Sequence, residues 1–419
     1  MMRRRRCSFL AWGLVVAAAA WWPPAAGAQT VVKMISHRYP ALEYYAKAIG
    51  EAPGVKLEAT LVPQDKCREI SIVTLSSGSS AYDIIWANDS LVLDYASKGW
   101  LEPLDDFLAK YRAQYQFQDF PEQVMKNVSY NGKVYGLPFV ANAMFFFYRK
   151  DVFDEKGLKP PATFADYAAL AKSLTTKDTF GTTISLKRVD AALNEFHWYL
   201  NAHGAKWFDA KWKPTFNGPD GVKALETLKA VAASAPPGVT SYANDESTVA
   251  LQQGLALMGL QWFSRAATMD NPAASKVVGK VAWANPPSVR AGVMAGQRIT
   301  TDVYAISKFS KADKDLVFRA LAHGSSRESM RGGAKLALPT RAPLLNDPEL
   351  VKQNRHWPAA LEAMKVAVPY PQLPEFVEIG EGVTLKVHQA LAGELTPKQA
   401  LDQATADAEA LLKSRGYYK

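Results

Sequence analysis

Apolar and polar positions follow two recurring patterns along most of this chain. Residues 31–35 form a short apolar run and residues 56–62 alternate, as β-strands do. Residues 39–50 and 66–76 instead repeat apolar positions every three to four residues, which is the period of an amphipathic helix. A further buried strand is expected at 82–87. This alternation of strands and helices predicts a parallel sheet covered on both faces, and therefore an α/β fold.

The same two patterns continue to the C-terminus. Asn131-Gly132 lies between two short apolar runs and has the composition of a type I′ hairpin turn. Thr163 and the Thr396-Pro397 pair are typical of helix N-termini. The other expected helices are 91–99, 150–156, 164–174, 190–202 and 220–233, the other strands are 255–260, 281–286 and 303–307, and the chain beyond 311 is expected to be mostly helical.

The first 28 residues have the composition of a secretory signal peptide. Arg3–Arg6 is a positive segment, residues 9–20 are apolar, and Ala26-Gly27-Ala28 is a small-residue cleavage site. Export to the periplasm is therefore expected. Removing four arginines lowers the formal charge from +9 to 9 − 4 = +5, and this modest value argues against nucleic-acid binding.

Cysteine and histidine usage excludes several kinds of chemistry. Cys7 lies in the expected signal peptide, so Cys67 has no partner for an internal disulfide, and stability must come from a large packed core. The sequence contains no H-E-x-x-H, no G-x-S-x-G and no paired Cys/His spacing. We therefore expect no catalytic residues, no metal and no cofactor.

Several segments in order resemble one protein family. They are YDIIWANDSLVLDYASKGWLEPLDDFL, NGKVYGLPFVANAMFFFYRKDVF, LALMGLQWFS, VYAISKFSKADKDLVFRAL, ALPTRAPLLNDPEL and ALAGELTPKQALDQATADAEALL. Together they resemble the family-1, carbohydrate-binding group of extracellular solute-binding proteins of ABC importers, to which maltose-binding protein belongs. The resemblance implies the type II periplasmic-binding-protein fold, in which two α/β lobes are joined by three crossing segments. It also implies a ligand in the cleft between the lobes, a membrane permease as partner, and a monomer.

The resemblance implies where the lobes begin and end. The N-terminal lobe is expected at 29–141 with 302–337, and the C-terminal lobe at 142–301 with 338–419. The three crossings are then expected within 139–146, near 298–303 and near 336–340. This explains the run of apolar residues that surrounds Asn142: a strand that leaves one sheet and enters another is buried along its length.

Sugar recognition needs planar polar groups that bond hydroxyls and aromatic faces that cover the apolar side of the sugar. For several candidates a structural role is the alternative: Asp89 could cap the helix that begins near Leu91, Asn142 could be a satisfied buried amide, and Trp86 and Trp198 could belong to the core. The candidate ligand-binding residues are His37, Arg38, Trp86, Asn88, Asp89, Asn142, Glu195, Trp198, Trp262, Arg298, Thr301, Asp302 and Glu375.

The ligand itself is left open between several classes. A neutral sugar, oligosaccharide or polyol fits the resemblance directly. If Arg38 and Arg298 both lined the cleft, they would instead favour a sugar acid or another anion. Asp89 and the tryptophans could enclose a polyamine. An exported enzyme acting on carbohydrate is the remaining alternative, and the absence of catalytic motifs argues against it.

Overall fold

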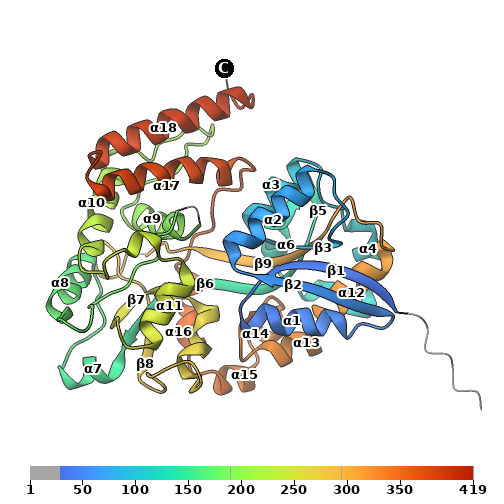
Figure 1. Cartoon of the computed structure of the whole chain (residues 1–419), viewed down its shortest axis with the longest axis horizontal. Coiled ribbons are helices and arrows are strands. Elements are labelled where there is room, and N and C mark those ends of the chain that lie inside the picture. The colour runs from blue at the N-terminus through green and yellow to red at the C-terminus, as the bar shows by residue number, and fades with distance from the viewer. Residues whose placement is uncertain (1–28, 189, 294, 419) are drawn as a thin grey trace, which may run out of the picture.

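The computed structural model describes residues 29–188, 190–293 and 295–418, so the expected signal peptide lies outside the described residues. The strands are β1 (Thr30–His37), β2 (Val55–Val62), β3 (Ile84–Asn88), β4 (Ser129–Tyr130), β5 (Lys133–Val134), β6 (Leu137–Arg149), β7 (Met258–Trp262), β8 (Val281–Ala284), β9 (Ile299–Ile306) and β10 (Leu338–Pro339). Figure 1 shows them in two lobes, each surrounded by helices.

The helices in the first half of the chain are α1 (Pro40–Gly50), α2 (Gln64–Ser76), α3 (Asp89–Ser97), α4 (Asp105–Lys110), α5 (Arg112–Tyr115), η1 (Phe117–Asp119), α6 (Glu122–Lys126), α7 (Lys150–Glu155), α8 (Phe164–Leu174) and α9 (Asp190–Ala202). Those in the second half are α10 (Pro219–Ala232), η2 (Val239–Ser241), α11 (Asn244–Gln252), η3 (Phe263–Asp270), α12 (Lys314–Gly324), α13 (Arg327–Gly333), α14 (Ala342–Leu345), α15 (Pro348–Gln353), α16 (Trp357–Lys365), α17 (Phe376–Ala392) and α18 (Pro397–Ser414). Among the described residues, none of these helices is long and apolar enough to cross a membrane.

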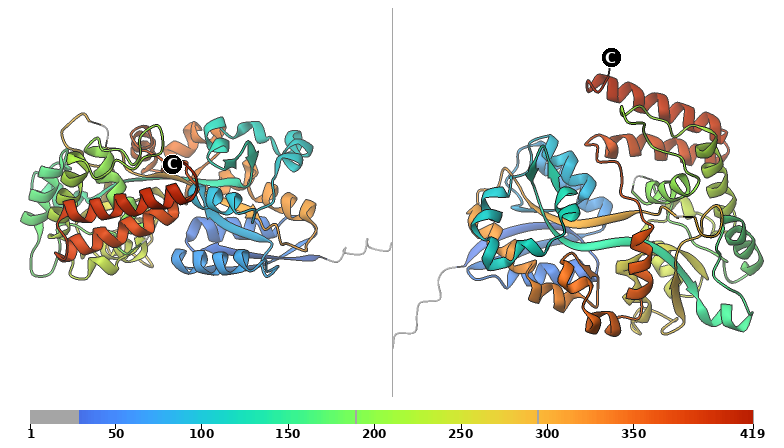
Figure 2. Two further views of the ribbon diagram at one scale, coloured as in Figure 1. Left: turned by 90° about the horizontal axis from the view of Figure 1, so that it is seen from above. Right: turned by 180° about the vertical axis from the view of Figure 1, so that it is seen from behind.

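One strand, β6, connects the two lobes. Its first half pairs with β9 and β10 in a sheet of order β10-β6-β9-β3-β1-β2, which we call the first-lobe sheet. From Met144 onward it pairs with β7 and β8 instead, and these strands form the sheet of the second lobe. The first eleven residues of β6 are all buried, as expected for a strand that lies inside two lobes in turn. β9 lies beside it at the crossing (Figure 2).

The first-lobe sheet is mixed rather than all-parallel, which corrects the expectation from the sequence. β2, β1 and β3 are parallel, because an α-helix connects each to the next. β9 is antiparallel to β3, and β6 is antiparallel to β9. Strand–helix alternation predicts parallel strands only where the chain stays in one lobe. Because β9 returns from the other lobe, the alternation does not predict its direction.

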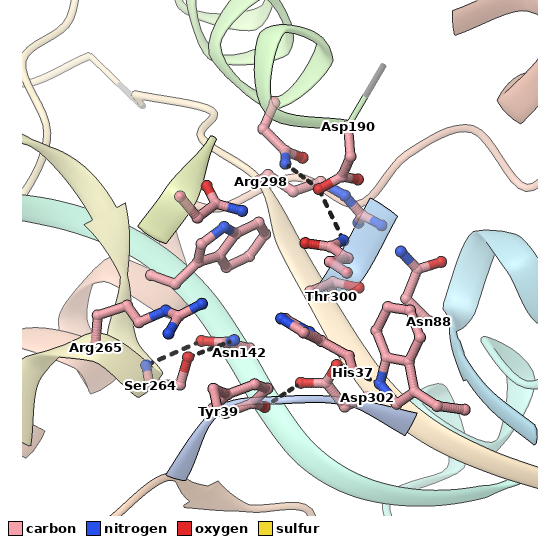
Figure 3. Close-up of a pocket in the computed structure, with 15 residues that line it drawn as sticks. His37, Tyr39, Asn88, Asn142, Asp190, Ser264, Arg265, Arg298, Thr300 and Asp302 are labelled. Atoms are coloured by element: carbon pink, nitrogen blue, oxygen red, sulfur yellow. Dashed lines mark hydrogen bonds between the residues drawn. The ribbon is translucent and has the colours of Figure 1, made fainter. Parts of the chain in front are cut away.

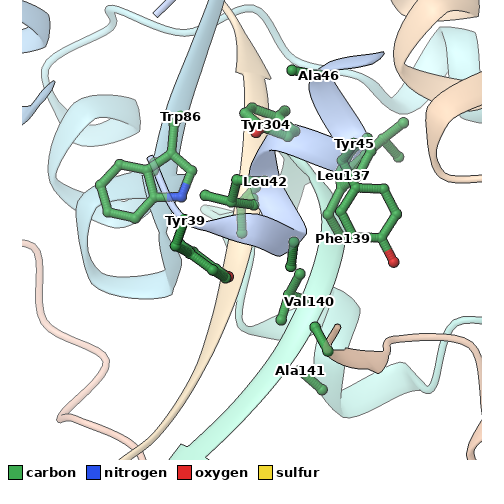
Figure 4. Close-up of a cluster of buried hydrophobic side chains, with 14 of the residues drawn as sticks. Tyr39, Leu42, Tyr45, Ala46, Trp86, Leu137, Phe139, Val140, Ala141 and Tyr304 are labelled. Carbon is green, nitrogen blue, oxygen red and sulfur yellow. The ribbon is translucent and has the colours of Figure 1, made fainter. Parts of the chain in front are cut away.

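Aromatic rings pack the first-lobe core where the crossing strands meet helix α1 (Figure 4). The ring of Phe139 on β6 lies edge-on to Tyr45 of α1 and to Tyr304 of β9, with centroids 5.3 and 4.8 Å apart. The Tyr304 hydroxyl is 2.8 Å from that of Ser36 at the end of β1. This packing fixes the carboxyl end of β1 against the crossing strand β9.

Local sequence signals explain several element boundaries. Asn131 and Gly132 have φ angles of 48° and 75°, as the type I′ hairpin turn requires. Thr163 and Thr396 each form a capping box with the third residue of the helix that follows, as their positions predicted.

Candidate functional site

A polar pocket lies between the lobes, beside the crossing strands. It encloses about 430 Å³, part of which is open to solvent. Figure 3 shows its side chains converging from both lobes. They are His37, Tyr39, Gln64, Trp86, Asn88, Asn142, Asp190, Asn194, Asn244, Trp262, Ser264, Arg265, Arg298, Thr300 and Asp302.

On the first lobe, Asp302 organises two aromatic side chains. It accepts a hydrogen bond from the Tyr39 hydroxyl at 2.6 Å and one from the Trp86 indole nitrogen at 3.0 Å. Burial raises the pKa of Asp302 to about 6, although these two donors oppose the shift. The His37 ring lies edge-on to Trp86, and burial holds the pKa of His37 well below its usual value. At neutral pH His37 is therefore an uncharged imidazole.

A buried ion pair fixes the beginning of strand β9 beside the pocket. Arg298 donates to Asp89 Oδ1 at 2.6 Å and to Oδ2 at 3.3 Å, and the two side chains are 1% and 0% exposed. Thr300 also donates to Asp89 Oδ1, at 2.7 Å. The Arg298 guanidinium lies 3.8 Å above the ring of Tyr370. Neither charge of this pair is left without a partner, so Arg298 contributes no free cation to the pocket.

On the second lobe, the N-terminal part of α9 presents a carboxylate and an amide. Asp190 and Asn194 are four residues apart, so they lie on one face of the helix. Asp190 Oδ2 accepts from Asn194 and from Gln64, both at 3.0 Å. The Tyr370 hydroxyl donates to Asn194 Oδ1 at 2.6 Å. Burial raises the pKa of Asp190, while Arg298 opposes the shift.

The base of the pocket is formed by β6, β7 and η3. Asn142 donates to the Ser264 hydroxyl at 3.0 Å and accepts from the Ser264 backbone N–H at 3.2 Å. Arg265 pairs with Asp245 at 2.6 Å and lies over the Tyr39 ring. Trp262, the last residue of β7, is 7% exposed and lines the same space.

Asn244 differs from the other amides of the pocket. It is 7% exposed, and its side-chain oxygen is buried without a hydrogen-bond partner. A buried acceptor without a partner costs about 1–3 kcal/mol, so such atoms are uncommon unless something else supplies the donor. Asn244 also lines a second, larger hollow of about 1580 Å³ that adjoins the pocket on its outer side.

The charges of the lining residues argue against an anionic ligand. Arg265 and Arg298 are both paired with acids, and His37 is uncharged. What remains are carboxylate and amide groups, which bond hydroxyls, and the flat faces of aromatic side chains. Within the described residues, no three His, Cys, Asp or Glu side chains are grouped in a way that could hold a metal ion.

The structure brings seven of the thirteen sequence candidates into this pocket: His37, Trp86, Asn88, Asn142, Trp262, Arg298 and Asp302. Asn88, rather than Asp89, is the N-cap of α3, because its side chain accepts from the Leu91 N–H at 2.9 Å. Asp89 lies behind the pocket against Arg298. Thr301 points away because side chains alternate along a strand, so Thr300 and Asp302 share the pocket face.

The other four candidates lie outside the pocket lining. Arg38 is exposed to solvent. Trp198 lies two helical turns beyond Asp190, where its indole donates to the backbone carbonyl of Pro287 in the second-lobe core. Glu195 is buried and accepts a hydrogen bond from the backbone N–H of Ser185, and burial raises the pKa of Glu195 to about 8. Glu375 precedes α17 and accepts from the Tyr417 hydroxyl.

The pocket also contains residues that the sequence did not single out. They are Tyr39, Gln64, Asp190, Asn194, Asn244, Ser264, Arg265 and Thr300. Most follow the end of a strand or begin a helix: Gln64 opens α2, Asp190 opens α9 and Asn244 opens α11. Polar residues at these element boundaries were a usable signal, because ligands in α/β folds lie where strands end and helices begin.

Comparison with known proteins gives a consistent result. The family model "Bacterial extracellular solute-binding protein" matches residues 36–329, more than two thirds of the chain. A probable amino-acid ABC transporter periplasmic-binding protein of Sinorhizobium fredii is 25% identical over 91% of this chain and 88% of its own. A mannitol-binding protein of Pseudomonas aeruginosa is 25% identical over 97% of this chain and 98% of its own.

A solved structure of an ABC transporter solute-binding protein is also similar to this chain. An ABC transporter solute-binding protein from Agrobacterium vitis with bound D-mannitol is 25% identical, with a TM-score of 0.81 over 93% of this chain and all of that one. The matches confirm the family resemblance and the two-lobed α/β fold class expected from the sequence.

Proposed function

Because this chain belongs to the bacterial extracellular solute-binding protein family, we propose that it captures a neutral sugar or sugar alcohol between its two lobes. Export through the signal peptide at 1–28 would place it in the periplasm. There it would act as a monomer and deliver the solute to the membrane permease of an ABC importer. The family is one of binding proteins, and the proposed role includes no catalytic step.

The observation that carries this proposal is the combination of paired cations with an unpaired buried acceptor. Arg265 and Arg298 are paired with Asp245 and Asp89, so neither arginine of the described pocket lining offers an anion a free positive charge. The unpartnered Asn244 oxygen needs a donor, which a ligand hydroxyl supplies.

A relative and a solved structure support a small ligand. The Pseudomonas aeruginosa relative is a mannitol-binding protein, and the Agrobacterium vitis structure contains D-mannitol. We therefore favour a linear polyol or a monosaccharide.

A cationic ligand is the second candidate, because one observation favours it. Once the arginines are paired, the carboxylates of Asp190 and Asp302 remain in the pocket near the rings of Trp86 and Tyr39. An ammonium group could bond a carboxylate and lie over a ring. Both carboxylates already accept hydrogen bonds from protein donors, which favours the neutral ligand.

Lobe closure explains how such a pocket would bind. The first lobe contributes His37, Trp86 and Asn88, whereas Asp190 and Asn244 come from the second, so only a ligand that contacts both lobes favours the closed arrangement. The units that we propose to move are those predicted from the sequence, 29–141 with 302–337 and 142–301 with 338–419.

A thermal-shift screen of the refolded protein tests the proposal. The panel contains sugar alcohols, monosaccharides, disaccharides, sugar acids and diamines, and refolding removes any ligand retained through purification. At 100 times its dissociation constant a ligand adds about 2.7 kcal/mol of stability, enough to see. A shift with a neutral polyhydroxylated compound is expected. Shifts confined to sugar acids or diamines would overturn the proposed ligand class.

A further inference from the structure

Helix α2 of the first lobe contacts the second lobe at the mouth of the cleft through three polar side chains. Gln64, Asp65 and Arg68 lie within about 100° of one another around the helix, so they share one side of it. Their partners come from two separate segments of the second lobe, residues 187–190 and helix α17. This set of contacts is distinct from the hydrogen bonds that shape the pocket floor.

The first two contacts lie next to the pocket. Gln64 donates to Asp190 Oδ2 at 3.0 Å, and both residues line the pocket. The Lys187 ammonium donates to Asp65 Oδ2 at 2.5 Å, with the side chains 44% and 55% exposed. The Gln64 contact therefore connects the ligand space directly to the contact between the lobes.

The third contact lies one helical turn further along α2. Arg68 is paired with Glu381 of α17, and the side chains are 18% and 45% exposed. Val377, one turn earlier on α17, packs against a hydrophobic cluster that includes residues of both lobes, and α17 contacts α3 of the first lobe. Ile72 and Leu91 of the first lobe line the same outer hollow as Val377 and Arg68. The ion pair thus lies beside an apolar contact across the cleft.

We propose that Gln64, Asp65 and Arg68, with Asp190, Lys187 and Glu381, form a latch that stabilises the closed arrangement of the lobes and slows release of the ligand. Hinge opening would separate α2 from α9 and α17, and so would break all three contacts together. A single exposed ion pair contributes little, but the three contacts on one helix face break in the same step and therefore oppose opening together. The Asp65–Lys187 and Arg68–Glu381 pairs lie outside the pocket lining, so these two contacts act on closure whatever the ligand is.

Two of the latch contacts are ion pairs, so the latch can be tested by reversing charges without knowing the ligand. Arg68→Glu places two acids opposite each other, and the double variant Arg68→Glu/Glu381→Arg restores the attraction in the reverse sense. The matched control is Lys398→Glu in α18, which breaks the exposed pair with Asp402 inside one helix of the second lobe. The radius of gyration is measured by small-angle X-ray scattering without ligand, at about 20 mM and about 500 mM salt.

The expected result is a larger radius of gyration for Arg68→Glu, with the double variant and the control close to the unmodified protein. Salt should move the unmodified protein toward the Arg68→Glu value, because ions screen exposed charges. For a ligand found in the screen, stopped-flow release should be about three- to tenfold faster in Arg68→Glu and restored in the double variant.

Two results would overturn the latch: equal radii for Arg68→Glu and the unmodified protein, or an equal change in the Lys398→Glu control. The inference rests on the proposed function only for the release rates. If no neutral polyhydroxylated compound binds, the proposed function fails, while the scattering measurement still decides on the latch.

Discussion

Replacing Asn244 with alanine should move stability and affinity in opposite directions. The buried side-chain oxygen of Asn244 has no partner in the protein, and burying such an acceptor costs about 1–3 kcal/mol. Its backbone carbonyl, which accepts from Thr248, is unchanged by the substitution. We expect the free energy of unfolding without ligand to stay constant or rise by about 1 kcal/mol.

Ligand affinity should fall in the same variant. If a ligand hydroxyl donates to this oxygen, its loss costs about 0.5–1.5 kcal/mol, which is about a two- to twelvefold higher dissociation constant. Isothermal titration calorimetry measures the affinity, and urea denaturation measures the stability.

Asn194→Ala is the matched control for this experiment, because the Asn194 amide already has protein partners. Its oxygen accepts from Tyr370 and its nitrogen donates to Asp190, so its removal leaves a buried hydroxyl unpaired. We expect Asn194→Ala to lose about 1–3 kcal/mol of stability. The reasoning would be refuted if Asn244→Ala lost as much stability as Asn194→Ala while ligand affinity stayed the same.

Three further predictions concern the pocket walls. The pKa of Asp302 is about 6 in the folded protein against an ordinary 3.8, so its contribution to stability is present below pH 4 and is lost as pH rises through about 6. Raising the pH from 4 to 7 should therefore lower the free energy of unfolding of the unmodified protein by up to about 3 kcal/mol relative to Asp302→Asn, and an unchanged difference between the two proteins would contradict this. Trp262→Leu keeps an apolar side chain but removes the flat face, and calorimetry should show about a two- to tenfold loss of affinity, whereas unchanged binding would place the ligand elsewhere. Arg298→Met leaves the charge of Asp89 buried without its ion-pair partner, so denaturation experiments should show a loss of about 3–5 kcal/mol of stability. Adding Asp89→Leu removes that charge and should restore most of the lost stability. If the double variant stayed as unstable as Arg298→Met, the ion pair would contribute more than mutual neutralisation.

Much of the fold could be predicted from local pattern. The boundaries of α8 and α9 match the periodicity, and Thr163 and Thr396 cap their helices as expected. Strand direction was less accessible: pattern alone indicated a parallel sheet, but β9 re-enters from the other lobe and pairs antiparallel with β3. The local sequence pattern does not indicate that a strand will pair with a segment so distant in the chain.

The site was harder to predict because it depends on which groups bond one another. Asp89 and Arg298 are 209 residues apart in the chain, yet they neutralise each other, which removes the free arginine that an anion site would need. Thr300 rather than Thr301 faces the pocket because of strand alternation, which depends on a register that the sequence did not give. Trp198 belongs to a helix face whose burial only tertiary packing decides.

The most direct test of the central claim is a crystal structure of the complex with the strongest neutral compound from the screen. We predict one ligand between the lobes, with a hydroxyl donating to the Asn244 side-chain oxygen, further hydroxyls bonded to side chains of both lobes, and its carbon face on Trp262. A ligand bound to one lobe alone, or in the outer hollow with the Asn244 oxygen still unpaired, would contradict the account.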